Sequence, residues 1–235
     1  MAGMEFDLSP EQDAFRGVVR EFAEGEIAPH AEEWDRTHTF PLDAVRAMGD
    51  LGLFGLVFPE EYGGSGADLL TLCLAIEEIA RVDASLAITL EAGVGLGANP
   101  IFRFGTPEQR RRWLPDLCAG RALGGFGLTE PDAGSDAGGT RTRAALDEAA
   151  GEWVIDGEKA FITNSGTAIT SIVTITARTG PREISAIVVP AGTPGFEVQP
   201  AYRKMGWHAS DTHGLTFRGC RVPADHLLGE RGRGF

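Results

Sequence analysis

The chain has 235 residues and a formal charge of −13 at pH 7, from 21 basic and 34 acidic side chains. Its apolar content of 43% and charged content of 23% are ordinary for a soluble globular protein. The acidic balance argues against nucleic acid or an anionic membrane as a partner. No apolar run approaches the ~20 residues that are needed to cross a bilayer.

Metal and disulfide chemistry are not expected. Cys73, Cys118 and Cys220 are far apart in the chain and include no CxxC pair, so neither a disulfide framework nor a zinc site is predicted. The five histidines include no HExxH motif or i, i+4 pair on one helix, so we expect no metal ligand among them. The first twelve residues lack the features of a secretory signal, and the expected compartment is the cytoplasm.

Residues 1–121 are predicted to form a helical domain. Ser9–Gln12 is a capping box with proline at the first helical position, and apolar residues follow it at helical spacing. Thr106–Gln109 repeats the same pattern before the last predicted helix. A dense apolar stretch at 69–79 indicates a buried helix between them.

Residues 122–228 change to short β-rich runs separated by turns, and residues 229–235 form a glycine-rich segment that is typical of a linker. Asp156–Gly157, between two such runs, predicts a two-residue hairpin. The expected fold is therefore α+β, with an N-terminal all-α domain followed by a small antiparallel β-barrel or sandwich domain.

The stretch Leu123–Asp136, LGGFGLTEPDAGSD, begins as a strand and then breaks into a turn. Consecutive small and turn-forming residues direct backbone N–H groups outward, where they can form a nest for an anion such as a diphosphate. Thr129 and Ser135 add hydroxyl donors that carry no charge. An ordinary surface turn is the alternative interpretation of the same residues.

A second stretch, Asp156–Asn164, reads DGEKAFITN. Strand alternation places Phe161 and Thr163 on one face, where an aromatic ring and a hydroxyl could cover and hydrogen-bond a planar cofactor ring. Ordinary core packing is the alternative for Phe161 and Ile162.

These two stretches, with Lys204–Thr212 and Arg221–Pro223, resemble the signatures of the acyl-CoA dehydrogenase family, and the resemblance runs from Phe6 to Phe235. It implies FAD as the cofactor, an acyl-CoA as the substrate, and cofactor contacts from Phe126, Leu128, Thr129, Gly134, Ser135, Phe161, Ile162 and Thr163. It places Ser135 and Ser185 near the substrate. Many members carry tryptophan where this chain has Phe161, which keeps the apolar cover but lacks the indole donor.

The reaction that the resemblance implies is α,β-dehydrogenation of an acyl-CoA thioester, with an electron-transferring flavoprotein as acceptor and a homotetramer as the assembly. The family's base is a glutamate of a C-terminal helical domain. It is expected beyond Phe235, so no catalytic residue is predicted within the chain. Glu91 and Glu130 could act as a base, but structural hydrogen bonding suits Glu130 better. We expect a truncated gene product or one half of a split enzyme, which binds flavin weakly and catalyses little alone.

Two other functions remain open from the sequence. The first is an acyl-CoA oxidase or a flavin monooxygenase of the same fold, and the second is a non-catalytic module that binds acyl-CoA or FAD. The length and branching of the acyl chain are also open, although Gly93, Gly95 and Gly97 are expected to leave space at the pocket floor.

Overall fold

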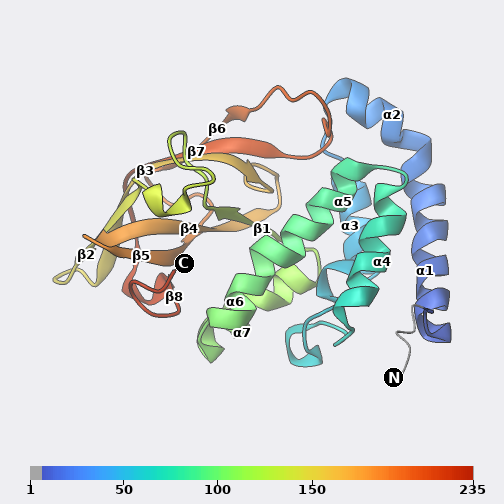
Figure 1. Cartoon of the computed structure of the whole chain (residues 1–235), viewed down its shortest axis with the longest axis horizontal. Coiled ribbons are helices and arrows are strands. Elements are labelled where there is room, and N and C mark those ends of the chain that lie inside the picture. Colours follow the sequence, from blue (N-terminus) through green and yellow to red (C-terminus); the bar gives the residue numbers. More distant parts are fainter. Residues whose placement is uncertain (1–6, 235) are drawn as a thin grey trace, which may run out of the picture.

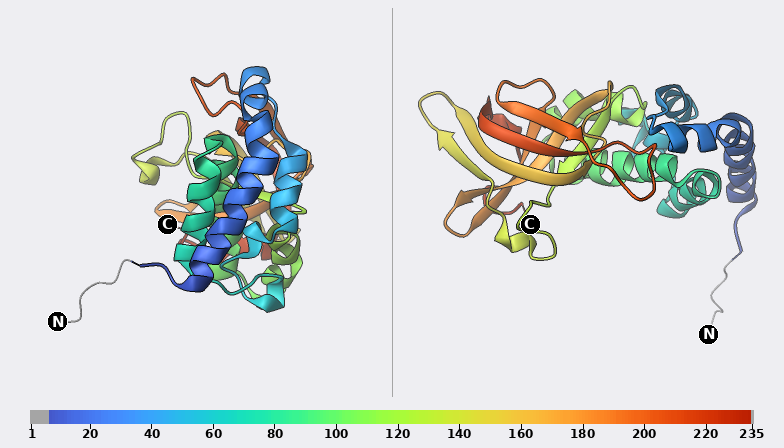
Figure 2. Two further views of the ribbon diagram at one scale, coloured as in Figure 1. Left: turned by 90° about the vertical axis from the view of Figure 1, so that its right-hand side faces the viewer. Right: turned by 90° about the horizontal axis from the view of Figure 1, so that it is seen from above.

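The structure is a computed structural model that describes residues 7–234; the predicted boundaries at residues 1 and 235 lie outside this range. Helices occupy one half of the molecule and a twisted sheet the other, as seen from two directions (Figures 1 and 2). The last long helix ends at Cys118 and the first strand begins at Leu123. Among residues 7–234, no helix is both long enough and apolar enough to cross a membrane.

The helical part contains seven α-helices within the described range: α1 (Pro10–Phe22), α2 (Ala28–Thr37), α3 (Leu42–Asp50), α4 (Leu69–Ala80), α5 (Ala84–Glu91), α6 (Asn99–Phe104) and α7 (Pro107–Cys118). Both predicted capping boxes form: the Ser9 and Thr106 hydroxyls accept from the N–H groups of Gln12 and Gln109, and both glutamine side chains bond back. These local bonds satisfy helix donors that would otherwise lack partners.

The strands are β1 (Leu123–Gly127), β2 (Arg143–Asp147), β3 (Glu152–Thr163), β4 (Thr170–Gly180), β5 (Glu183–Pro190), β6 (Phe196–Ala201), β7 (Thr212–Pro223) and β8 (Leu227–Leu228). Their order is β6-β7-β3-β2-β4-β5-β8, with β1 also paired to β4. The helical domain followed by a β-domain confirms the predicted class. The sheet is mixed rather than antiparallel, because β1 and β2 both run parallel to β4. The chain between β1 and β4 serves as the crossover that such a pairing requires.

The hairpin predicted at Asp156–Gly157 is wrong. β3 runs unbroken through both residues, and the register against β7 shifts between Ile155 and Gly157. Gly157 has a φ of 147°, and a Cβ built there would lie 2.6 Å from the Cα of Thr142. The glycine therefore marks a β-bulge where another part of the chain approaches closely.

The two halves share a hydrophobic core at a π-helical segment, Ala92–Ala98, which lies against β1. The prediction that the glycines of this segment leave space is wrong at two positions. A Cβ at Gly93 would meet the Phe54 ring at 2.9 Å, and one at Gly97 would meet the Gly124 carbonyl oxygen at 2.6 Å. These glycines permit close packing of helix on strand and do not open a pocket.

His226 connects α7 to the sheet. Its Nδ1–H donates to the Val188 carbonyl at 3.0 Å, and its Nε2 lies 3.2 Å from an Arg112 guanidinium nitrogen, which can only donate. His226 is therefore neutral, with the proton on Nδ1. Burial, opposed by the Val188 hydrogen bond and reinforced by the charge of Arg112, holds the pKa of His226 below its ordinary value.

The stabilisation from neutral His226 is expected to be lost on acidification. Because its folded-state pKa is depressed, the unfolded chain takes up the proton first, and stability falls as the pH drops below about 6.5 toward the folded value. Urea unfolding at pH 8 and pH 5.5 should show a smaller loss for His226→Gln than for the wild type. Equal losses in the two proteins would contradict this assignment.

Candidate cofactor site

β1 leads into a loop of residues 128–142 that carries the predicted anion-binding turn. Leu128 and Thr129 are half-buried, whereas Gly134 and Ser135 are exposed. A Cβ at Gly134 would have no atom within 4 Å. Four backbone N–H groups of this turn have no acceptor among residues 7–234: those of Asp132, Gly134, Ser135 and Asp136. Such a group of exposed, unpaired donors is suited to an anion.

The end of β3 carries the predicted ring contacts. Phe161 is 65% exposed, and its φ of 62° is rare for a bulky residue. Its ring lies 4.9 Å from that of Tyr202. Ile162 is buried in the sheet core, and Thr163 is half-buried. A large exposed aromatic held in a strained backbone indicates a surface that is built for contact.

The two stretches lie side by side. The Ala160 N–H donates to the Thr129 carbonyl at 2.9 Å, and a Cβ at Gly125 would lie 3.0 Å from the Thr163 carbonyl oxygen. Within residues 7–234 the hydroxyls of Thr129 and Thr163 have no hydrogen-bond partner. Unpaired hydroxyls, an exposed aromatic ring and an N–H nest on adjoining segments fit a ligand with a polar-edged ring and phosphates.

Two cavities are lined in part by residues of these segments. The larger, about 620 Å³, is bounded by Phe126, by Arg103 and Phe104 of α6, and by the segment that follows β8. The smaller, about 280 Å³, lies beside Pro131 and Tyr202. The larger volume is within the range of small-molecule sites.

Ser185 differs from the other predicted contacts. It is fully buried, its Oγ lies 2.7 Å from the Thr179 Oγ, and it accepts from the Gly232 N–H at 2.8 Å. Contact between Ser185 and a substrate stays a prediction, and it would require the segment around Gly232 to move away.

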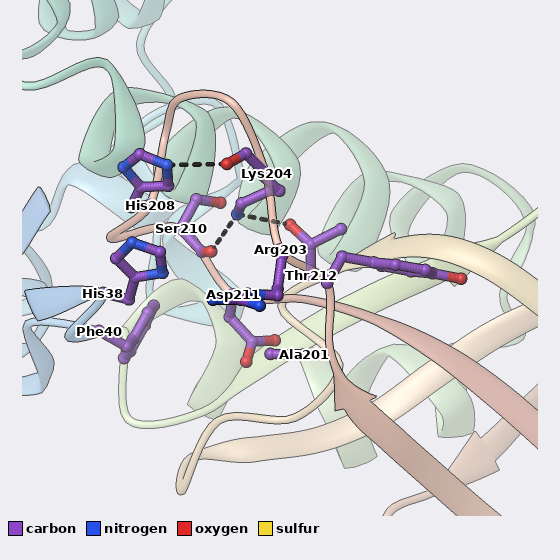
Figure 3. Close-up of a pocket in the computed structure, with 10 residues that line it drawn as sticks. His38, Phe40, Ala201, Arg203, Lys204, His208, Ser210, Asp211 and Thr212 are labelled. Atoms are coloured by element: carbon purple, nitrogen blue, oxygen red, sulfur yellow. Dashed lines mark hydrogen bonds between the residues drawn. The ribbon is translucent and has the colours of Figure 1, made fainter.

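The stretch Lys204–Thr212 forms a loop with bonds both within itself and to other parts of the chain. The Lys204 ammonium donates to the Ser210 carbonyl and the Thr212 hydroxyl, in a pocket of about 170 Å³ next to His38 (Figure 3). Asp211 accepts from the Asn164 and Gly166 N–H groups through its carbonyl and carboxylate oxygens. The loop is therefore hydrogen-bonded to the residues that directly follow β3.

Two charged residues that were not among the predicted cofactor contacts are at the centre of the site. Lys159 and Glu130 form an ion pair of 2.8 Å, with their side chains 0% and 4% exposed. The sequence carries no clear signal for Lys159, since β3 also holds the charged residues Glu152, Asp156 and Glu158. Structural hydrogen bonding was expected for Glu130, and this is confirmed by its bonds to the N–H groups of Arg141 and Thr142.

Comparisons with known proteins identify the family of both parts of the chain. Residues 9–121 match the model of the acyl-CoA dehydrogenase N-terminal domain, and residues 125–220 match that of the middle domain. A probable acyl-CoA dehydrogenase of Bacillus subtilis, YngJ, is 48% identical over 99% of this chain and 61% of its own length.

Solved structures show the same fold. Butyryl-CoA dehydrogenase from Megasphaera elsdenii superimposes with a TM-score of 0.94 at 41% identity, over 99% of this chain and 62% of that one. A chain from a study of the electron transferring flavoprotein of Acidaminococcus fermentans gives 0.94 at 40% identity, over 99% and 61%. This chain thus spans about 60% of the length of these relatives. By sequence and by fold, it belongs to the acyl-CoA dehydrogenase family.

Proposed function

We propose that this chain provides the FAD-binding part of an enzyme that removes hydrogen from Cα and Cβ of an acyl-CoA thioester. The observation that carries the proposal is the set of unpaired donors at one place: the free N–H groups around Gly134 and Ser135, next to the free hydroxyls of Thr129 and Thr163. A protein with a charge of −13 needs such local dipoles to hold a diphosphate.

Each part of the site has a task in this proposal. The loop N–H groups neutralise the diphosphate, Phe161 covers one face of the ring, and the two threonine hydroxyls bond its polar edge. FAD would supply the hydride acceptor. Glu130 is unsuited to act as the base because its carboxylate is buried in bonds to Lys159 and the loop.

Partners and location are part of the same proposal. Family membership supports an acyl-CoA substrate, and the relative from the study of an electron transferring flavoprotein supports such a protein as electron acceptor. A homotetramer and a cytoplasmic location are further expectations, the latter based on widely spaced cysteines and reduced thiols.

Adding a negative charge to the nest is expected to weaken FAD binding. Gly134→Asp places a carboxylate beside the diphosphate, and Gly134→Asn is its neutral isostere; both side chains have open space. Fluorescence titration should give a Kd for FAD at least about tenfold higher for the aspartate variant than for the asparagine variant, which corresponds to a loss of ~1.4 kcal/mol of binding free energy. The two variants should have equal Kd values for riboflavin, which lacks the phosphates. Equal FAD affinities in the two variants would contradict the phosphate assignment.

The visible spectrum of the wild-type chain with FAD, before and after anaerobic addition of butyryl-CoA, tests the enzymatic part. A flavin band that persists supports a cofactor scaffold whose base lies elsewhere, whereas bleaching would mean that a residue of this chain is the base. Peroxide release in air would indicate an oxidase. Failure to bind FAD at any concentration would overturn the proposed cofactor role.

A further inference from the structure

The buried pair of Glu130 and Lys159 takes no part in the proposed reaction. All three hydrogens of the Lys159 ammonium have an acceptor: Glu130 Oε1 at 2.8 Å, the Leu128 carbonyl at 3.2 Å and the Thr176 hydroxyl at 3.3 Å. Lys159 is therefore a saturated cation. Its stem also packs against β1, where a Cβ at Gly127 would lie 3.1 Å from the Lys159 Cγ.

Glu130 closes the loop that carries the free N–H groups. One carboxylate oxygen accepts from the Arg141 N–H at 2.6 Å, and the other accepts from Thr142 N–H at 3.0 Å and from Lys159. The backbone of Glu130 exchanges two hydrogen bonds with Ala133. A single carboxylate thus joins the start of the loop to its end, eleven residues later.

Electrostatics explains why the pair is suited to this task. The hydrogen bonds from Lys159 and from the two backbone N–H groups outweigh burial and hold the pKa of Glu130 below its ordinary value. Burial disfavours the charged form of both groups, so it raises the pKa of a carboxyl group and lowers that of an ammonium group. For Lys159 this effect is the larger one, and its pKa lies below the ordinary value. We take both groups as charged, because the Lys159 acceptors and the Glu130 donors leave neither charge unpaired. A buried, saturated pair is rigid, and removal of one partner leaves the other charge uncompensated.

We propose that Glu130 and Lys159 are positioning residues, and that their ion pair holds residues 130–142 of the loop in the conformation that directs its free N–H groups at the FAD diphosphate. The pair couples this part of the loop to β3 at Lys159, two residues before Phe161. The identity of the ligand in this inference rests on the proposed function. The hydrogen bonds that hold the loop do not depend on it.

The test uses Glu130→Gln and Lys159→Met in the whole chain, titrated with FAD and with riboflavin, which lacks the phosphates. FAD affinity is expected to fall at least about tenfold in each variant, and riboflavin affinity to change less than about threefold. Thr129 is tied to β3 by the Ala160 N–H bond, so its ring contact does not need the ion pair, whereas the phosphate contacts depend on residues 130–142. Loss of FAD and riboflavin affinity by the same factor, or no loss of either, would overturn the proposal.

Val189→Ala serves as a control for general destabilisation, since Val189 is fully buried in the sheet core and has no contact with the loop bonds described above. It should leave the ratio of FAD to riboflavin affinity unchanged. Should Lys159→Met not fold, Glu130→Asp replaces it, because this variant keeps the charge but shortens the reach to the Arg141 and Thr142 N–H groups.

Amide hydrogen exchange separates this inference from the proposed function. The Arg141 and Thr142 N–H groups should exchange at least about tenfold faster in the pair variants than in Val189→Ala, whether or not flavin binds. Glu130→Gln removes one of the two accepting oxygens, and Lys159→Met removes the cation that holds the carboxylate in place. Unchanged exchange would overturn the positioning role. A wild-type chain that binds no FAD, with faster exchange in the variants, would refute the cofactor role and retain the anchor.

Discussion

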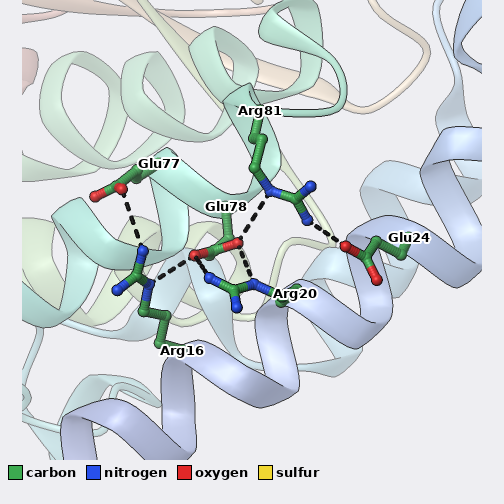
Figure 4. Close-up of polar contacts among 6 residues, drawn as sticks. All are labelled: Arg16, Arg20, Glu24, Glu77, Glu78 and Arg81. Carbon is green, nitrogen blue, oxygen red and sulfur yellow. Dashed lines mark hydrogen bonds and ion pairs between the residues drawn. The ribbon is translucent and has the colours of Figure 1, made fainter.

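Replacing Glu78 by glutamine is expected to lower the free energy of unfolding by roughly 3 kcal/mol, the range for breaking a buried ion pair. Glu78 lies on α4 with its side chain 1% exposed, and it faces three arginines (Figure 4). Its oxygens lie 2.6 Å from Arg16 Nε, 2.7 Å from Arg20 Nη2 and 3.3 Å from Arg81 Nε. A glutamine of the same shape would accept fewer of these bonds and carry no charge.

Glu77→Gln is the matched control. Glu77 precedes Glu78 on the same helix, but its side chain is 64% exposed and its one ion pair, to Arg16, is 3.4 Å long. Its loss should change the free energy of unfolding by less than ~0.5 kcal/mol, as exposed pairs do. Urea unfolding at pH 7 measures both variants. A similar small effect for the two would mean that the arginines gain as much from water as from Glu78.

The Glu78 cluster also predicts an acid dependence. Hydrogen bonds from Arg20, followed by those from Arg16 and Arg81, lower the pKa of Glu78 from 4.5 to about 2 despite its burial. Because the folded value is depressed, the stabilisation is complete above about pH 4.5 and is lost as the pH falls toward 2. The stability gap between the wild type and Glu78→Gln should therefore narrow on acidification within this window.

Gly97→Ala is expected to cost about 3 kcal/mol, at the upper end of what overpacking does, because the clash is between two backbones. A Cβ at Gly97 would lie 2.6 Å from the carbonyl oxygen, 2.9 Å from the carbonyl carbon and 3.0 Å from the Cα of Gly124. None of these atoms can rotate away, so the π-helical segment must move off β1. β1 leads directly into the loop that carries the proposed cofactor contacts, and FAD affinity should also fall.

Gly95→Ala provides the comparison within the same segment. Its Cβ would meet only the Glu91 side chain, whose carboxylate oxygen at 2.9 Å is the flexible end of a long group. The midpoint of thermal unfolding should fall by several degrees more for Gly97→Ala than for Gly95→Ala, as expected for a difference of a few kcal/mol. Equal midpoints would show that the segment can shift on the strand without cost.

Much of the local structure follows from the sequence. The capping boxes at Ser9 and Thr106 predict the starts of α1 and α7 because their donors and acceptors lie three residues apart. The change from helical to β periodicity near residue 122 likewise matches the first strand at Leu123. The sequence also predicts the turn after Thr129, whose N–H groups at Gly134 and Ser135 have no acceptor within residues 7–234.

Contacts between distant segments were decided only by the tertiary structure. The parallel pairing of β1 with β4 joins Leu123 to Thr170, and no local pattern states the direction of such a pair. Asp156–Gly157 has the composition of a hairpin, yet it forms a bulge because Thr142 occupies the space beside it. Lys159 and Glu130, 29 residues apart, meet only when β1 and β3 come together. Helix caps and turns depend on residues close together in the sequence, so the sequence predicts them. The residue that fills a space or balances a charge comes from a distant segment, so only the folded structure identifies it.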